Sequence, residues 1–201
     1  MNTKHAAEDS RQHTRLVWRE EGRRPVFTCP IFSIQELTCH SPDNESRLFT
    51  VLDAPDWAIV VPVLHRPQGD AFVMVRQWRH GAQELSLEFP GGVFEKGEAP
   101  HLAAARELRE ETAYEAGVVR SLGVCSPNPA IMSNRVHFFL AEELKALEAQ
   151  ALDEDEYVDV EIVPVQEVFE NMGKPPYIHA LMLSALATCR HLPWRPSPDG
   201  L

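Results

Sequence analysis

The sequence predicts an α+β fold: an α/β/α sandwich in which helices cover a mixed sheet, with a small β-sheet at the N-terminus. Three observations predict it. Strand-like runs, which alternate or are rich in β-branched residues, recur along the chain. Helical patterns are few and irregularly spaced, which disfavours a regular βαβ series. Residues 25–53 have strand-like composition without a core of their own.

The N-terminal segment, residues 1–53, is expected to form the small sheet. Residues 1–20 are polar and mixed in charge, so little order is expected there. Strands are expected at residues 26–34 and 47–52. The Ser-Pro-Asp-Asn sequence at residues 41–44 is typical of a turn between them.

Residues 54–195 are expected to form the main domain, and residues 196–201 a loose tail. A turn at residues 67–70 would join its first two strands. A helix at residues 100–112 begins with proline, and a last helix at residues 177–191 is followed by one. Strands are expected at residues 57–65, 71–77, 118–125, 135–140 and 157–165.

The composition limits the class of partner. The 201 residues suffice for one well-buried domain. A formal net charge of -11 disfavours attraction to phosphate backbones, so no nucleic-acid partner is expected. A negatively charged substrate would have to be attracted by local basic residues or by bound cations.

The N-terminal residues lack the apolar stretch of a signal peptide, and no run approaches the roughly 18 apolar residues that span a bilayer. We therefore expect a cytoplasmic protein with no membrane partner. The four cysteines show no Cys-x-x-Cys spacing, so buried free thiols are expected rather than a zinc site or disulfides.

The helix at residues 100–112 carries three carboxylates on one face. At about 100° per residue, Glu107, Glu110 and Glu111 fall within an arc of about 100°. The core face is expected on another side, at Leu102, Ala105 and Leu108. A solvated helix face is the simplest interpretation of such a cluster.

The alternative interpretation is a metal site. Like charges at this spacing cost roughly 0.2–0.5 kcal/mol per pair, so a cation would relieve the repulsion. Carboxylate oxygens suit Mg²⁺ or Mn²⁺ better than zinc. Arg106 could pair with one carboxylate and fix its orientation. The preceding Gly91 and Gly92 allow the backbone to approach a ligand and to turn a carbonyl toward a cation.

Residues 92–114 resemble the Nudix box, a glycine, five residues, a glutamate, seven residues, and then Arg-Glu-aliphatic-x-Glu-Glu-x-Gly-aliphatic. The box residues present are Gly92, Glu98, Arg106, Glu107, Leu108, Glu110 and Glu111. Ala113 stands where the box has its last glycine, and Tyr114 where an aliphatic residue is common. A left-handed alanine would cost roughly 1 kcal/mol, so the helix is alternatively expected to continue to Gly117.

Outside the box, residues 49–186 are similar to the ADP-ribose pyrophosphatase branch of the Nudix family. This resemblance implies a Nudix fold in which Arg79 contacts the substrate phosphates and Glu88 supports the metal site. Trp57, a candidate for stacking on a nucleobase, and Arg135 are the other expected substrate-binding residues. In the loop before Arg135, Ala130 replaces a glycine of this branch, a change that looks more like the nucleotide-diphosphate-sugar hydrolases.

The acidic run at residues 153–156 precedes a predicted strand. Such runs are usually solvated loops. In ADP-ribose hydrolases, however, an acidic loop at this place supplies a general base and a further metal contact. The resemblance therefore implies that Glu154 is the base and that Glu156 binds the metal.

Together, these similarities imply Mg²⁺-dependent hydrolysis of the pyrophosphate of ADP-ribose or a related nucleoside diphosphate sugar, with Mn²⁺ as an alternative cation. The products would be a nucleoside monophosphate and a sugar phosphate. The expected metal ligands are Glu107, Glu111, Glu156 and the Gly91 carbonyl, assisted by Glu110. The branch also implies a homodimer that exchanges its N-terminal sheet. A non-catalytic nucleotide-sugar sensor and an isomerase on the same fold are the competing functions.

Overall fold

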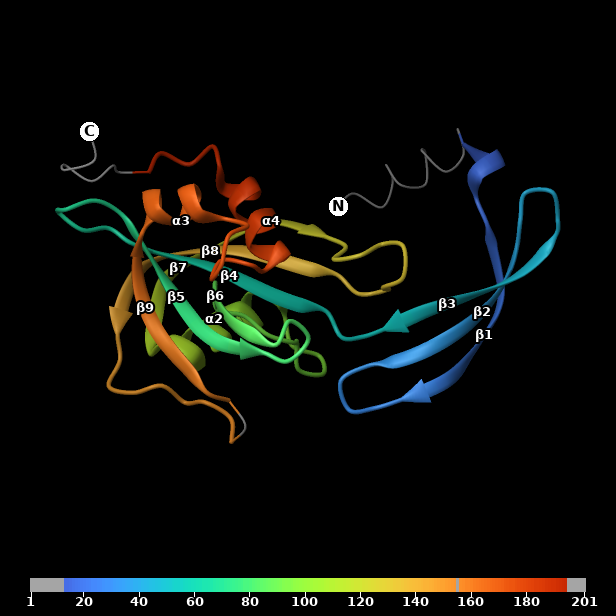
Figure 1. Ribbon diagram of the computed structural model, residues 1–201, viewed down its shortest axis with the longest axis horizontal. Helices are drawn as coiled ribbons and strands as arrows, with labels where there is room; N and C mark the ends of the chain where they lie inside the picture. Colours follow the sequence, from blue (N-terminus) through green and yellow to red (C-terminus); the bar gives the residue numbers. More distant parts are fainter. Residues whose placement is uncertain (1–12, 155, 195–201) are drawn as a thin grey trace. The chain divides into compact units, whose positions relative to one another are not determined.

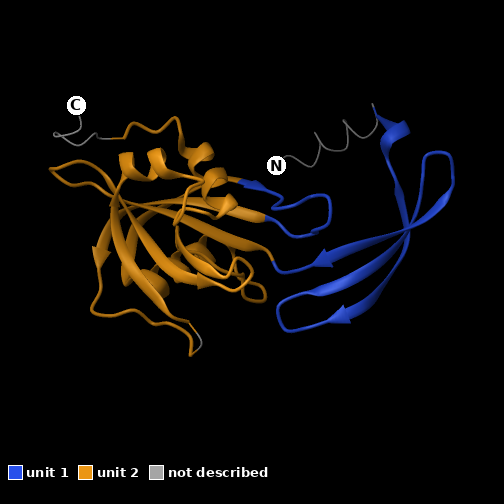
Figure 2. Cartoon of the chain, viewed as in Figure 1, with its two compact units in different colours: residues 1–55, 124–135 blue, residues 56–123, 136–201 orange. Residues whose placement is uncertain are grey.

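The computed structural model describes residues 13–154 and 156–194, which form two compact units (Figures 1 and 2). Unit 1 takes in the chain up to Pro55 together with Val124–Arg135, and unit 2 takes in Asp56–Gly123 and the chain from Val136 onward. The tail predicted at residues 196–201 and Asp155 of the acidic run lie outside the described residues.

Unit 1 contains an antiparallel sheet in the order β1-β2-β3. A short 3-10 helix, η1 (Thr14–Leu16), precedes it, and its strands are β1 (Arg19–Thr28), β2 (Ser33–His40) and β3 (Ser46–Asp53). The expected turn before β3 is confirmed, because Asn44 donates its N–H to Ser41 O and has a φ of 65°. The expectation of little order is wrong for residues 14–20.

The strand predicted at residues 26–34 is wrong, because this stretch spans the connection between β1 and β2. The alternation of apolar residues continues through the connection, so the sequence pattern does not reveal that the strand ends there. Pro30 cannot donate to a ladder. The chain reverses there, with Cys29 N–H donating to Phe32 O at 3.0 Å.

The sheet of unit 1 has almost no core, as its composition predicts. Among its residues only Leu37 and Cys39 are buried. Large apolar side chains of unit 1 are instead exposed, namely Trp18, Val26, Phe27, Ile31, Leu48 and Phe49. The segment Val124–Arg135 joins this unit through β3, where Leu52 N–H donates to Ile131 O and Ser133 N–H to Leu52 O.

Unit 2 is built on a mixed sheet in the order β6-β5-β4-β8-β7, with β9 also paired to β5. Strands β4 and β8 pair in parallel, whereas β5 is antiparallel to β4, β6 and β9. The strands are β4 (Trp57–Leu64), β5 (Ala71–Arg79), β6 (Glu84–Glu88), β7 (Tyr114–Cys125), β8 (Val136–Ala146) and β9 (Val158–Pro164).

Helices lie on both faces of this sheet (Figure 1). They are α2 (Pro100–Thr112), α3 (Val165–Asn171) and α4 (Ala180–Cys189). Successive side chains of β4 point to opposite faces. Ala58 and Val60 pack against α2, whereas Ile59 and Leu181 of α4 line one cavity. The predicted α/β/α layering around a mixed sheet is therefore confirmed.

Helix α2 has the predicted bounds, but part of its predicted core face is wrong. Leu102 is 54% exposed, and Ala103, Ala104 and Leu108 are fully buried in its place. The helix is rotated about its own axis relative to the prediction, so that some of its carboxylates are buried. Leu102 is displaced to the solvent side as a result.

Three short elements, η1, β6 and α3, are absent from the sequence prediction, and most of β2 lies outside the predicted strands. β6 has only five residues, and α3 follows β9 directly, so that the predicted strand runs one residue too far, to Val165. All four cysteines are free, and Cys39 and Cys189 are buried. Within residues 13–154 and 156–194, no helix has the length and apolar character needed to cross a membrane.

Candidate functional site

The connection from β6 to α2 crosses β4 closely at two glycines. Val60 N–H donates to Pro90 O and Ala58 N–H to Gly92 O, both at 2.9 Å. A Cβ on Gly91 would lie 2.1 Å from Ala58 O, and a Cβ on Gly92 would lie 2.5 Å from Glu107 Oε1. At Gly91 the clash is with backbone, so only glycine fits there, and at Gly92 any side chain would displace the Glu107 carboxylate. The backbone thereby reaches the carboxylates of α2, where Gly91 N–H donates to Glu111 Oε2 at 2.8 Å.

Glu107 and Glu111 are buried, with 7% and 4% of their surface exposed. Burial raises the pKa of Glu107 to about 7, against the opposing effect of Arg106. Burial also raises the pKa of Glu111 to about 8, and the charges of Glu107 and Glu156 add to this shift. The solvated-face interpretation is therefore wrong for these two residues. Two carboxyl groups held so close in a buried place favour a cationic partner.

Arg106 is the protein's own partner for this cluster. Its guanidinium hydrogen-bonds to Glu98 at 3.0 Å, to Glu107 at 2.9 Å and to Glu110 at 3.0 Å. The sequence predicts pairing with one of the helix carboxylates, and the structure shows pairing with two of them as well as with Glu98. One guanidinium cannot neutralise all of these groups, and Glu111 is not among its partners.

The donor set fits a hard divalent cation, since it consists of carboxylate oxygens beside a glycine backbone. In the described part of the chain, no three His, Cys, Asp or Glu side chains are already arranged as a metal site. The oxygens of Glu107 and Glu111 bond instead to Arg106 and to Gly91 N–H. A cation would have to compete with these hydrogen bonds.

The loop before β9 is attached to the C-terminal end of α2. Ala151 N–H donates to Glu110 O at 3.0 Å, and the Gln150 side chain donates to Glu111 O. Glu156 is half-buried, and its charge contributes to the raised pKa of both Glu107 and Glu111. The charge of Glu156 thus acts on both buried carboxylates, and its predicted role as a metal ligand stays a prediction. Glu154 is exposed in a turn of the same loop.

Arg79 and Glu88 form a two-point ion pair across β5 and β6. The Arg79 Nε and Nη2 atoms lie 2.9 Å and 2.5 Å from the carboxylate oxygens. Burial opposes both charges, but the hydrogen bonds and the attraction between the charges together outweigh it, lowering the pKa of Glu88 and raising the pKa of Arg79. The Glu88 side chain is 4% exposed and that of Arg79 is 39% exposed. Glu88 therefore holds a guanidinium that solvent or a ligand can reach.

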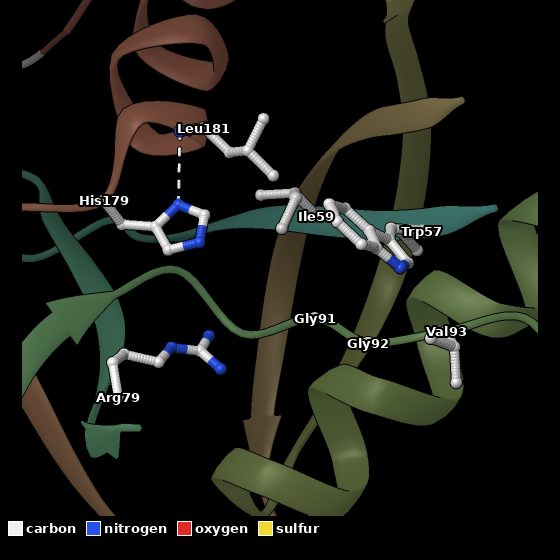
Figure 3. Close-up of a pocket in the computed structure, with 9 residues that line it drawn as sticks. Trp57, Ile59, Arg79, Gly91, Gly92, Val93, His179 and Leu181 are labelled. Atoms are coloured by element: carbon white, nitrogen blue, oxygen red, sulfur yellow. Dashed lines mark hydrogen bonds between the residues drawn. The ribbon is translucent and has the colours of Figure 1, made fainter. Parts of the chain in front are cut away.

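A cavity of about 210 Å³ adjoins these groups in unit 2 (Figure 3). Its lining includes Trp57, Ile59, Arg79, Gly91, His179 and Leu181. Arg79 and His179 lie at one end and Trp57 at the other. The structure thus places Trp57, Arg79 and Gly91 together, as their predicted roles require. Arg135 is exposed and belongs to unit 1, so its predicted role stays a prediction.

A family model of the NUDIX domain matches residues 55–182. The chain belongs to the Nudix family. It is 39% identical over 149 residues to the ADP-ribose pyrophosphatase of Bacillus subtilis, over 74% of this chain and 79% of the relative. It is 29% identical over 146 residues to the methanol dehydrogenase activator of Bacillus methanolicus, over 72% of this chain and 77% of the relative.

A solved structure of an ADP compounds hydrolase has the same fold. It matches with a TM-score of 0.75 at 21% identity, covering 87% of this chain and 94% of that chain. The predicted Nudix fold and the resemblance to the ADP-ribose pyrophosphatase branch are confirmed. The chain is an enzyme of the Nudix family. All carboxylates of the Nudix box are present, which argues against the competing sensor function.

The backbone conformation shows how the chain accommodates Ala113 in place of the last glycine of the Nudix box. The helix ends at Thr112, and Ala113 itself takes the left-handed conformation with φ 55° and ψ 35°. Its N–H donates to Arg109 O at 3.0 Å. The alternative expectation, a helix that continues to Gly117, is wrong. The alanine occupies the glycine position of the box in the glycine conformation.

Replacing Ala113 with glycine should therefore raise the free energy of unfolding by about 1 kcal/mol, because glycine adopts this conformation without steric cost. The melting temperature should rise by roughly 2–4 °C for a domain of this size. Ala105→Gly, in the middle of α2, is the matched control and should lower stability by about the same amount. Equal or lower stability of Ala113→Gly would contradict this account.

His179 is a residue of this site that the sequence prediction misses. The last helix is predicted to begin at residue 177, which places His179 inside it, whereas α4 begins at Ala180 with His179 as its N-cap. A histidine immediately before an apolar helix is the one feature that could have indicated it. Its ring reaches the same cavity as Arg79.

Proposed function

We propose that this Nudix enzyme hydrolyses the pyrophosphate bond of ADP-ribose or a related nucleoside diphosphate sugar, with Mg²⁺ or alternatively Mn²⁺ as the cation. The products would be a nucleoside monophosphate and a sugar phosphate. The observation that carries the proposal is the buried pair Glu107 and Glu111, on which the charge of Glu156 acts and which lies next to a cavity lined by Arg79. The 39% identical relative named as an ADP-ribose pyrophosphatase supports the choice of substrate.

The cation would be held by Glu107, Glu111 and Glu156, with the Gly91 carbonyl as a further ligand. When bound, such a cation neutralises phosphate oxygens and makes a nearby water more acidic. Arg106 would orient Glu107 and Glu110, to which it already donates. Glu110 would assist from the edge of the cluster, since its carboxylate is less buried than those of Glu107 and Glu111.

The substrate would lie in the cavity beside this cluster. Arg79 would contact the diphosphate, held in place by Glu88, and Trp57 would stack on a ring at the opposite end. Glu154 would accept the proton of the attacking water. Glu154 is exposed, and its carboxylate takes part in none of the hydrogen bonds described for this loop.

A substrate screen tests this function. ADP-ribose, GDP-mannose, UDP-glucose and diadenosine polyphosphates would be incubated with Mg²⁺, with Mn²⁺ and with a chelator, and the products identified. We expect cation-dependent release of a nucleoside monophosphate from ADP-ribose or a nucleotide sugar. The presence of Ala130, where this branch has a glycine, in the Pro-rich loop before Arg135 is the reason to include the sugars other than ribose. Hydrolysis of none of them, or equal hydrolysis in the chelator, would refute the proposal.

The stability of the metal-free protein should depend on pH. The pKa values of Glu107 and Glu111, about 7 and about 8, lie above the ordinary value of 4.5. The folded state thus binds these protons more tightly than the unfolded state, so the stability that these two groups contribute is fully present below pH 4.5 and is lost as pH rises through 7 and 8. Because Mg²⁺ competes with these protons, it should raise the melting temperature more at about pH 8.5 than at about pH 5.5.

The measurement is a set of thermal melts at both pH values, with excess Mg²⁺ and with a chelator. A Glu107→Gln/Glu111→Gln variant is the control, since it keeps every other titrating group and should lose most of the difference. An equal effect of Mg²⁺ at the two pH values would contradict the assignment of these carboxyl groups.

We also propose that the protein is a homodimer that associates through unit 1. A sheet that buries only two residues and exposes Trp18, Phe27, Leu48 and Phe49 has an apolar surface that association would cover. Light scattering at micromolar concentration should give twice the mass of one chain. A fully active monomer under those conditions would rule the dimer out.

A further inference from the structure

The N-cap of α4 determines which nitrogen of His179 carries its proton. Leu181 N–H donates to His179 Nδ1 at 3.2 Å, so Nδ1 must be an unprotonated acceptor. A neutral imidazole with Nδ1 as acceptor carries its hydrogen on Nε2. Burial also lowers the pKa of His179, against the effect of Glu88, which favours the neutral ring. His179 is thus a neutral donor with a fixed direction.

The Nε2–H group faces the Arg79–Glu88 pair without being bonded to it. Nε2 lies 4.0 Å from Glu88 Oε2, which is too long for a hydrogen bond. The His179 side chain is 29% exposed, so a ligand can reach it. Figure 3 shows the imidazole and the Arg79 guanidinium at the same end of the cavity.

His179 and Arg79 also line a second cavity, of about 570 Å³. Its other walls include Trp78, Glu88 and Ala180. The linings of the two cavities therefore share one charged donor and one neutral donor. A nucleoside diphosphate derivative has the corresponding form, with a diphosphate in the middle and a ring-bearing group at each end.

We propose that His179 is a substrate-binding residue whose Nε2–H donates to the diphosphate of the nucleoside diphosphate derivative, where it passes between the two cavities. This inference rests on the proposed function and adds a second diphosphate donor to Arg79. A neutral donor contributes direction without further charge. Because its direction is fixed, such a donor binds the diphosphate only in one position, which favours substrates that carry a large group on both sides of the diphosphate.

Two substitutions separate the cap from the donor. His179→Asn keeps an acceptor for Leu181 N–H, since asparagine is among the best N-caps, but its side chain is too short to replace Nε2–H. His179→Gln keeps an N–H at about the reach of Nε2 and loses the cap. Hydrolysis of ADP-ribose gives KM, calorimetry with the non-hydrolysable α,β-methylene analogue and Mg²⁺ gives Kd, and thermal melts report the cap.

His179→Asn should raise KM and the Kd of the analogue about tenfold or more, the loss expected for a hydrogen bond to a charged group, at an unchanged melting temperature. His179→Gln should lower the melting temperature and recover most of the affinity. Unchanged affinity in His179→Asn would show that His179 is only a cap. Equal losses of affinity in both variants would show that the loss does not follow the Nε2–H donor. Either result would overturn the inference. If the wild-type protein binds the analogue but hydrolyses nothing, the proposed function fails while the Kd values still decide the role of His179. Absence of binding by the wild type overturns both.

Discussion

Replacing Glu111 with glutamine should reduce kcat by roughly 10²–10⁴-fold and leave the melting temperature at or above that of the wild type. The reduction follows from the loss of a cation ligand, whose contribution to transition-state charge stabilisation is worth several kcal/mol. Stability is retained because Glu111 is 4% exposed, and burial disfavours its charge, raising its pKa to about 8. Glutamine has the same shape, is neutral, and keeps an oxygen that can accept the Gly91 N–H.

Turnover of ADP-ribose, the Mg²⁺ concentration at half-maximal rate, and thermal melts are the measurements. Glu115→Gln is the matched control, because Glu115 lies four residues further on and is exposed on β7. It should change neither rate nor melting temperature. Turnover like that of the wild type in Glu111→Gln would remove the metal assignment, whatever the control shows.

The second large effect is expected at the proton acceptor. Glu154→Gln should lower kcat by roughly 10²–10⁴-fold, the usual contribution of a general base, with little change in the Mg²⁺ requirement. Glu156→Gln should raise the Mg²⁺ requirement instead. The reason is that Glu156 shares the electrostatic environment of Glu107 and Glu111, and a cation-bound carboxylate is a poor base because the cation lowers its pKa. Glu154 is exposed in the same loop and is left for the water.

Rates across a range of Mg²⁺ concentrations separate the two effects in one experiment. Glu148→Gln, another exposed carboxylate of the same loop, controls for a general change in loop charge and should leave both quantities unaltered. Normal turnover in Glu154→Gln would mean that this part of the run is solvated and that the base lies elsewhere. If Glu156→Gln left the Mg²⁺ requirement unchanged, its place as a ligand would be lost.

Local sequence rules predict much of unit 2. The bounds of α2 follow from Pro100 at its start and from the periodicity of its apolar residues, and the structure has the same bounds. Strands β4 and β5 are long, apolar and separated by a turn, which makes their existence easy to predict. The spacing of the Nudix box also brings Glu107 and Glu111 together, since both lie on one helix face.

The features of the site that the sequence does not predict depend on tertiary packing. The burial of Glu107 and Glu111 results from the close approach of Gly91 and Gly92 to β4 and α2, which no helical pattern contains. The role of His179 depends on where α4 begins. That boundary is set by packing rather than by a capping residue that sequence rules recognise, because histidine is not a preferred N-cap.

The attachment of Val124–Arg135 to β3 makes unit 1 a composite of two stretches that are far apart in the chain. Leu52 bonds through its backbone to both Ile131 and Ser133, and Asn134 donates to Pro55 O at 3.0 Å. Removing the chain before Asp56 would leave these backbone groups of the second stretch without their partners. The loop between β7 and β8 therefore depends on the N-terminal stretch for part of its hydrogen bonding.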